Sequence, residues 1–119
     1  MPQWTPITEA ALLKRVAQGQ ARMTAAQLRL WNAVRVPPRK WQQDPYGVEG
    51  QGFWVVGLIG QTAIWYNDRE DGFNRSRYSQ VGSLDDYWCN QDELEVTIGY
   101  LMATLERGAD LVLMRQPAV

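Results

Sequence analysis

Apolar positions in the first third of the chain recur with helical spacing. Thr8 is suited to cap a first helix, and Gly19 is suited to end it. Thr24 begins a second helix, where Gln27 three residues later completes a capping box. Pro37-Pro38 ends that helix, because proline disfavours helical backbone in the residue before it. The pattern predicts a two-helix segment over residues 1–36.

The middle of the chain has the composition of strands. Lys40–Gln43 is expected as a short edge strand, and Phe53–Ile59 is apolar on both faces, as in a central strand. Gly60-Gln61 fits a two-residue turn that returns the chain into Thr62–Tyr66. Phe73–Val81 reads as a third, mostly polar strand at an edge or facing solvent. These hairpin connections predict an antiparallel sheet of about four strands over residues 39–82.

A third helix is predicted over residues 90–107. Asn90 is expected as its N-cap with Glu93 completing a capping box, and Gly108 is expected to end it. One helical face carries Leu94, Ile98, Leu101, Met102 and Leu105. Leu111–Met114 could add a short closing strand. We therefore expect one α+β domain over residues 1–119, with its helices packed on one face of the sheet.

Composition narrows the possible chemistry. The chain has no histidine and one cysteine, Cys89, which removes His-based nucleophile systems and the common zinc sites. A single cysteine favours a reducing compartment, and neither a signal peptide nor a membrane span is visible, so we expect a cytoplasmic protein. The net charge of −1 gives no support for nucleic-acid binding. We expect no cofactor and no metal, and we expect Cys89 to be buried.

The densest group of chemistry-bearing residues lies between two aromatic strand ends. We predict a partner-binding surface there, because aromatic rings supply contact area and acids and amides supply directed hydrogen bonds. Its expected members are Trp65, Asp68, Glu70, Asp71, Asn74 and Tyr78, with Asp85 and Asp86 as a second rim. The same residues also suit a solvated hairpin turn, which needs Asp, Asn and Gly for its backbone geometry.

Three other features have weaker functional interpretations. The carboxylates of the middle and late chain could do acid–base work if one lay in an apolar pocket. The segment Asp44–Gly52 is glycine-rich but lacks the features of a phosphate-binding loop, so we expect a flexible loop. Basic residues near the Pro-Pro turn could touch nucleic acid, or pair with the acidic hairpin within the fold or between two copies. They are Arg29, Arg35, Arg39 and Lys40.

A resemblance adds a further expectation. The segment Phe53–Leu94, about a third of the chain, contains Trp-Tyr-Asn-Asp, Glu-Asp-Gly-Phe-Asn and Tyr-Trp-Cys-Asn-Gln-Asp-Glu-Leu-Glu stretches. In these it resembles a group of small uncharacterised bacterial proteins. In size and element order the chain is also similar to the α+β immunity proteins that neutralise bacterial toxins, including the superfamily related to the yeast cell-wall assembly regulator. The resemblance implies a cytoplasmic protein-binding role and no catalytic residue.

The leading hypothesis is a non-enzymatic immunity or regulatory protein. It would act by occlusion, docking its acidic and aromatic surface onto a basic region of a partner protein. One alternative is a small carboxylate-dependent hydrolase or lyase, which requires a concave pocket holding two carboxyl groups. Another is a structural homodimer in which the polar third strand pairs with its symmetry mate.

Overall fold

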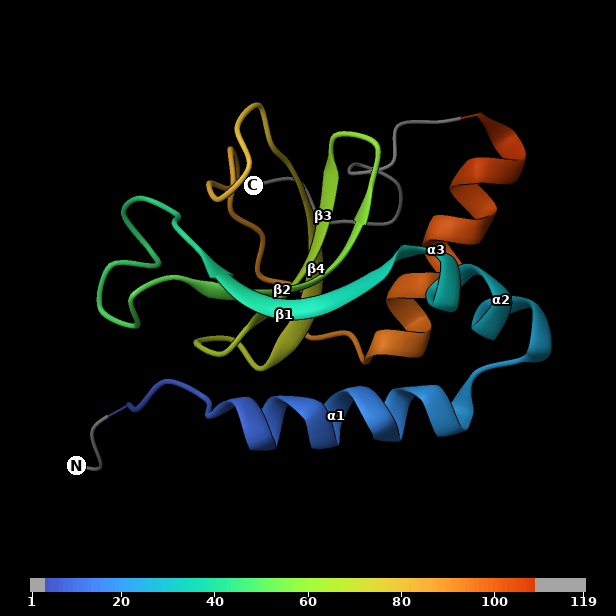
Figure 1. Ribbon diagram of the computed structural model, residues 1–119, viewed down its shortest axis with the longest axis horizontal. Coiled ribbons are helices and arrows are strands. Elements are labelled where there is room, and N and C mark those ends of the chain that lie inside the picture. The colour runs from blue at the N-terminus through green and yellow to red at the C-terminus, as the bar shows by residue number, and fades with distance from the viewer. Residues whose placement is uncertain (1–3, 109–119) are drawn as a thin grey trace.

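Three helices and a four-stranded antiparallel sheet make up the computed structural model, which describes residues 4–108. The elements are α1 (Glu9–Arg22), α2 (Ala25–Val34), β1 (Arg35–Trp41), β2 (Phe53–Ile59), β3 (Thr62–Asn67), β4 (Gly72–Arg77) and α3 (Leu94–Arg107). The strands lie in chain order, β1-β2-β3-β4, and all three helices pack on the sheet (Figure 1). The expected α+β class is confirmed.

Both N-terminal helices begin at the predicted caps. The Thr8 hydroxyl accepts the Ala11 N–H at 3.1 Å, and Thr24 and Gln27 form the reciprocal capping box. The end predicted for the first helix is wrong, because α1 continues through Gly19 to Arg22. Gly19 is buried against α3, where a Cβ atom would lie 2.8 Å from the Leu94 Cβ. The glycine therefore allows two helices to approach closely and does not end one.

The first strand begins earlier than the sequence indicates. The Lys40–Gln43 prediction is wrong in its bounds, since β1 starts at Arg35, directly after α2, and includes Pro37 and Pro38. An edge strand tolerates a proline at a position where the N–H would point away from the sheet, because no ladder bond is lost there. The pairing with β2 is irregular between Arg35 and Arg39, where the prolines lie.

The two central strands separate two hydrophobic cores. In the first core the sheet packs against the helices, and its buried members include Leu12, Trp31, Val56, Ile64 and Ile98. A bulge in β2 leaves Val56 without a direct partner in β3. Val56 belongs to the first core and Val55 to the second. The apolar character of β2 on both faces thus follows from burial on both faces.

The second core is covered by a segment without regular secondary structure. Leu84 and Trp88, from the connection between β4 and α3, pack on Trp41, Val55 and Trp65. We call residues 78–93 the covering segment (Figure 1). It forms a third layer that hairpin and helix patterns do not predict.

The polar strand predicted over Phe73–Val81, which is β4 in the structure, is buried. β4 spans Gly72–Arg77, and only Arg77 in it is exposed, so the expectation of a solvent-facing strand over 73–81 is wrong. It does lie at an edge of the sheet, as predicted. Its polar side chains, including Arg75 and Ser76, are buried because the helices cover one face and the covering segment the other.

The last helix begins later than predicted. Glu93 is the N-cap of α3, without a side-chain capping bond, and the Asn90 side chain instead contacts Asn74 of β4. Gly108 ends the helix in the left-handed conformation, with φ +69°, as expected. The predicted strand Leu111–Met114 lies outside the described residues. Within residues 4–108, no helix is both long enough and apolar enough to cross a bilayer.

Candidate functional site

Asn67 organises the turn between β3 and β4, where the predicted surface is centred. Its side-chain oxygen accepts the N–H groups of Arg69 at 3.0 Å and Glu70 at 3.2 Å. Its side-chain amide donates to the Trp88 carbonyl at 2.9 Å, which ties the turn to the covering segment. Asp71 has a left-handed backbone, φ +63°, and donates its N–H to the Asn67 carbonyl. The turn thus uses its polar residues for backbone geometry.

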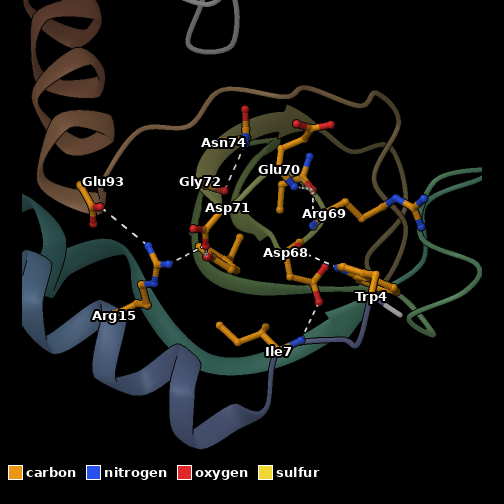
Figure 2. A network of polar contacts seen from close by, with 12 residues as sticks. Trp4, Ile7, Arg15, Asp68, Arg69, Glu70, Asp71, Gly72, Asn74 and Glu93 are labelled. Carbon is orange, nitrogen blue, oxygen red and sulfur yellow. Dashed lines mark hydrogen bonds and ion pairs between the residues drawn. The ribbon is translucent and has the colours of Figure 1, made fainter. Parts of the chain in front are cut away.

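Asp68 attaches the N-terminal segment to this turn. Its carboxylate accepts the backbone N–H of Ile7 at 2.8 Å, and its carbonyl accepts the Trp4 indole N–H at 2.9 Å (Figure 2). The other carboxylate oxygen is buried and has no hydrogen-bond partner among the described residues. Burial disfavours the charged form and raises the pKa of Asp68. Asp68 is therefore an internal tie between segments distant in sequence.

Asp71 attaches α1 to the same turn. Its carboxylate accepts a hydrogen bond from the Tyr66 hydroxyl. It also accepts one, at 2.6 Å, from the Arg15 guanidinium (Figure 2). These bonds lower the pKa of Asp71, with the tyrosine contributing most. Arg15 also lies 3.8 Å from a Glu93 carboxylate oxygen at the start of α3. The expected partner-facing acid is thus paired within its own chain.

Two predicted contact residues lie inside the protein. Trp65 is 0% exposed, and its indole N–H donates to the Ser76 hydroxyl at 2.9 Å. Asn74 is 1% exposed. Its oxygen accepts both the backbone N–H and the side-chain amide of Asn90 at 2.9 Å, and its own amide donates to the Asn90 carbonyl at 3.1 Å. In this fold neither side chain offers contact area to a partner.

The second rim also supports the fold. The Asp86 carboxylate accepts the Arg77 backbone N–H at 3.1 Å, and the Asp85 backbone N–H donates to the Arg77 carbonyl at 2.9 Å. Asp85 also accepts the Ser79 hydroxyl at 2.6 Å while remaining exposed. With the bond from the Phe73 N–H to the Asp92 carbonyl, these contacts occupy positions on the outer edge of β4. That edge is the one that the homodimer hypothesis requires to be open.

Tyr78 and Glu70, the two remaining residues of the predicted partner-binding surface, are partly exposed. Tyr78 is half-buried, donates its hydroxyl to the Gly60 carbonyl at 2.7 Å, and meets the Trp41 ring edge-on. Glu70 is also half-buried, and its described hydrogen bond runs through its backbone N–H. The structure therefore gathers Asp68, Glu70 and Asp71 on one turn and separates them from the Asp85–Asp86 rim along β4.

Hollows in the surface formed by residues 4–108 include two that bear on the hydrolase hypothesis. One, of 380 Å³, is lined by residues 42–44, 47–48 and 51–52, and Asp44 is its single lining carboxylate. The other, of 240 Å³, lies beside β1 and has no lining carboxylate. Neither hollow holds the carboxyl pair that a hydrolase of the expected kind requires. Among residues 4–108, no cluster of three Asp, Glu or Cys side chains is placed to hold a metal ion.

The basic residues near the prolines do not pair with the acidic hairpin. Lys40 donates to the Gly50 carbonyl at 2.7 Å, and Arg35 lies over the Trp31 ring. Over the described part of the chain, Arg29, Arg35 and Arg39 form no ion pair. The sequence places these basic residues near one another but gives no sign of the hollow lined by Arg39, because its other lining residues come from segments far apart in the chain.

Cys89 is exposed, so the expectation of a buried cysteine is wrong. Its neighbour Trp88 is buried. In extended chain, successive side chains point in opposite directions, so burying the tryptophan turns the cysteine outward.

Comparison of the chain with protein-family models, with curated proteins and with solved structures finds no match. The two resemblances described above therefore stay predictions, and function must be argued from the geometry of the chain itself.

Proposed function

We propose that the chain is a non-enzymatic binding protein that acts by contacting another protein. The observation that carries this proposal is that several acidic side chains form hydrogen bonds within the fold. Asp68, Asp71 and Asp86 each accept a backbone or side-chain hydrogen bond that joins two parts of the fold. An acid–base pair needs carboxyl groups that face a substrate. Because these carboxylates are held by hydrogen bonds within the fold, we favour a role based on surface contact over one based on acid–base catalysis.

Within this proposal the contact surface moves away from the acidic hairpin. Trp65 and Asn74 are interior, and Asp71 is neutralised by Arg15. A partner-binding role for Glu70 and Asp85 keeps its physical basis, because both retain surface. An immunity or regulatory protein that covers a partner's working surface is the form of binding that agrees best with the size of the chain and with the two described hollows, neither of which is lined by a pair of carboxylates.

A cytoplasmic location belongs to the same proposal. The support is Cys89, which is exposed and has no second cysteine to pair with. An oxidising compartment would expose such a thiol to intermolecular pairing, whereas a reducing compartment keeps it free.

A capture experiment with a functional readout tests the proposal. The tagged full chain is incubated with a lysate of the organism from which the gene comes, and co-purifying proteins are quantified by mass spectrometry. We expect one stoichiometric partner whose own activity falls when the chain is added back to the purified partner. Bait recovered alone at both low and high salt would contradict the proposal, as would a partner that the chain covalently alters.

A further inference from the structure

We propose that the hollow beside β1 binds an acidic segment of a partner protein that carries one apolar anchor residue. The site is the hollow beside β1, with the exposed Arg39 in its lining, and we call it the β1 groove. Its lining includes Val36, Arg39, Trp41, Val55, Leu58 and Val81. This inference rests on the proposed function and names the surface and the partner chemistry.

The groove is built from three separate segments. Arg39 and Trp41 come from β1, Leu58 from β2, and Val81 from the covering segment. Trp41 is buried as its floor, whereas Val81 is 75% exposed at its rim. An exposed valine beside a buried tryptophan leaves apolar surface that an incoming side chain can remove from water.

The size of the groove favours a side chain over a small-molecule ligand. Its volume is 240 Å³. Small-molecule sites usually have roughly 300–1,000 Å³ and several convergent polar groups. Arg39 is the single charged group in this lining. Such a hollow suits one apolar anchor residue, with the rest of the contact spread over the surface around it.

Arginines without ion pairs indicate that the partner segment is acidic. Four other arginines (Arg15, Arg22, Arg69 and Arg77) form ion pairs with carboxylates of this chain. In contrast, Arg29, Arg35 and Arg39 are exposed and, across residues 4–108, have no carboxylate within ion-pair distance. Of the three, Arg39 lines the groove, whereas Arg35 lies over the Trp31 ring on the helix-covered face of the sheet and Arg29 lies within α2. Guanidinium groups bind carboxylates in directed, often bidentate geometry, so acids beside the anchor residue complement this surface.

The prolines decide how the segment is held. Pro37 and Pro38 lie in β1 and have no N–H to offer to an added strand. A second copy pairing edge to edge through β1 meets the same obstacle. Recognition therefore depends on the apolar anchor and on Arg39 more than on backbone pairing.

Nuclear magnetic resonance of the full chain tests the inference with defined peptides. The probe is the acetylated, amidated peptide Glu-Asp-Leu-Asp-Glu. One control peptide replaces leucine with serine, and the other replaces the acids with lysines. We expect the first peptide alone to shift the Trp41 indole signal and the Val55 and Leu58 methyl signals. These shifts should weaken when NaCl is raised from about 50 to about 300 mM, because salt screens exposed charges.

Matched variants locate the interaction. Arg39→Glu and Val81→Asp change exposed side chains of the groove, and we expect each to weaken peptide binding by at least about tenfold. Arg107→Glu makes the same charge change as Arg39→Glu at the end of α3 and should leave binding unchanged. Absence of shifts up to about 5 mM peptide, equal shifts with the lysine peptide, or concentration-dependent shifts of the groove signals without peptide would each overturn the inference.

Failure here can be separated from failure of the proposed function. If the lysate experiment yields a stoichiometric partner that Arg39→Glu still captures, the chain binds proteins through another surface, and only the β1 groove assignment fails. If neither a partner nor peptide binding is found, both fail.

Discussion

Asp68 and Asp71 show how strongly local surroundings set the behaviour of like residues. They lie in one turn, yet the pKa of Asp68 is raised and that of Asp71 is lowered. Asp68 has lost water around its buried oxygen, whereas Asp71 gains hydrogen bonds from Tyr66 and Arg15 while staying 65% exposed. The two acids therefore affect stability in opposite directions as pH falls.

Substitutions that remove the charge of Asp68 or Asp71 should change the pH dependence of stability in opposite directions. Asp71 stabilises the fold above its unfolded pKa of about 3.9, and that contribution is lost as pH falls through its lower folded pKa. Asp71→Asn should thus lower the free energy of unfolding at neutral pH by about 0.2–1 kcal/mol, as for exposed ion pairs, and flatten the acid limb. Asp68 carries a burial penalty above its raised folded pKa, and this penalty disappears as pH falls toward about 4. Asp68→Asn should therefore steepen the loss of stability in that window.

Urea midpoints measured from about pH 7 to about pH 2.5 check both variants. Glu106→Gln removes an exposed carboxylate of α3 and controls for net charge. Acid limbs that change in the same direction for Asp68→Asn and Asp71→Asn would contradict the assignment.

The exposed cysteine gives a second prediction at the residue scale. The Cys89 thiol of the native chain should react with one equivalent of Ellman's reagent without denaturant, because its side chain is at the surface. The absorbance change at completion should match that of the unfolded chain. A thiol that reacts only after unfolding would show that Cys89 is buried after all.

Helix packing determines what glycine does in α1 and α3. Gly19→Ala should destabilise the protein by about 1–3 kcal/mol, because the added methyl group would overlap the Leu94 side chain. Gly99→Ala is the matched control. Its methyl group would meet only the end of the Gln27 side chain at 3.3 Å, so helix propensity should prevail and stabilise by up to about 1 kcal/mol. Thermal or chemical denaturation of the pair decides between these outcomes, and equal stabilisation by both would contradict the close approach of α1 to α3.

The paired amides of Asn74 and Asn90 hold β4 to the covering segment. Asn74→Ala should lower stability by about 1–3 kcal/mol, because it leaves partly buried groups of Asn90 without these partners. Asn32→Ala, an exposed asparagine on α2, should change stability by less than about 0.5 kcal/mol. Hydrogen exchange at the Asn90 amide provides the local readout. Unchanged protection of that amide in Asn74→Ala would show that the pair does not anchor the segment.

Elements whose signals are local were predictable from sequence. Thr8 and Thr24 cap their helices through neighbours three residues away, and Gly108 ends α3 through its own backbone conformation. Asn90 carries the same kind of signal but does not cap, because its partner Asn74 lies 16 residues away in sequence. A local pattern cannot show whether the Asn90 side chain caps the following helix or bonds a residue distant in sequence.

The candidate site was predictable only as a segment of chain. Asp68, Glu70 and Asp71 lie together on the turn between β3 and β4, as the sequence predicts. Arg15, which neutralises Asp71, is 56 residues away in the sequence and was not predictable as its partner. The burial of β4 likewise depends on the covering segment, whose apolar residues have neither helical nor strand spacing. Surface and interior therefore could not be told apart before the layers were known.

At the scale of the whole molecule, the covering segment should behave as part of the core. Trp88→Ala should cost about 3–5 kcal/mol, as for large buried aromatics. The Trp88 indole N–H is buried without a hydrogen-bond partner among the described residues. Trp88→Phe should therefore be much milder, at about 1–2 kcal/mol. Denaturation of the two variants tests this, and a similar small loss for both would mean that the segment contributes little to the fold.

The covering segment also predicts where the chain can vary in length. Irregular connections usually accept insertions and deletions because they lie outside the packed layers. Here Leu84 and Trp88 fill the second core, and Gly72 leaves no room for displacement, since a Cβ there would lie 2.2 Å from the Asn90 carbonyl oxygen. The Gly82 carbonyl and the Leu84 N–H also bond the backbone of Gln42. Variation in length should therefore be confined to the exposed residues 79–81, whereas residues 82–90 should keep a fixed length, as a strand does.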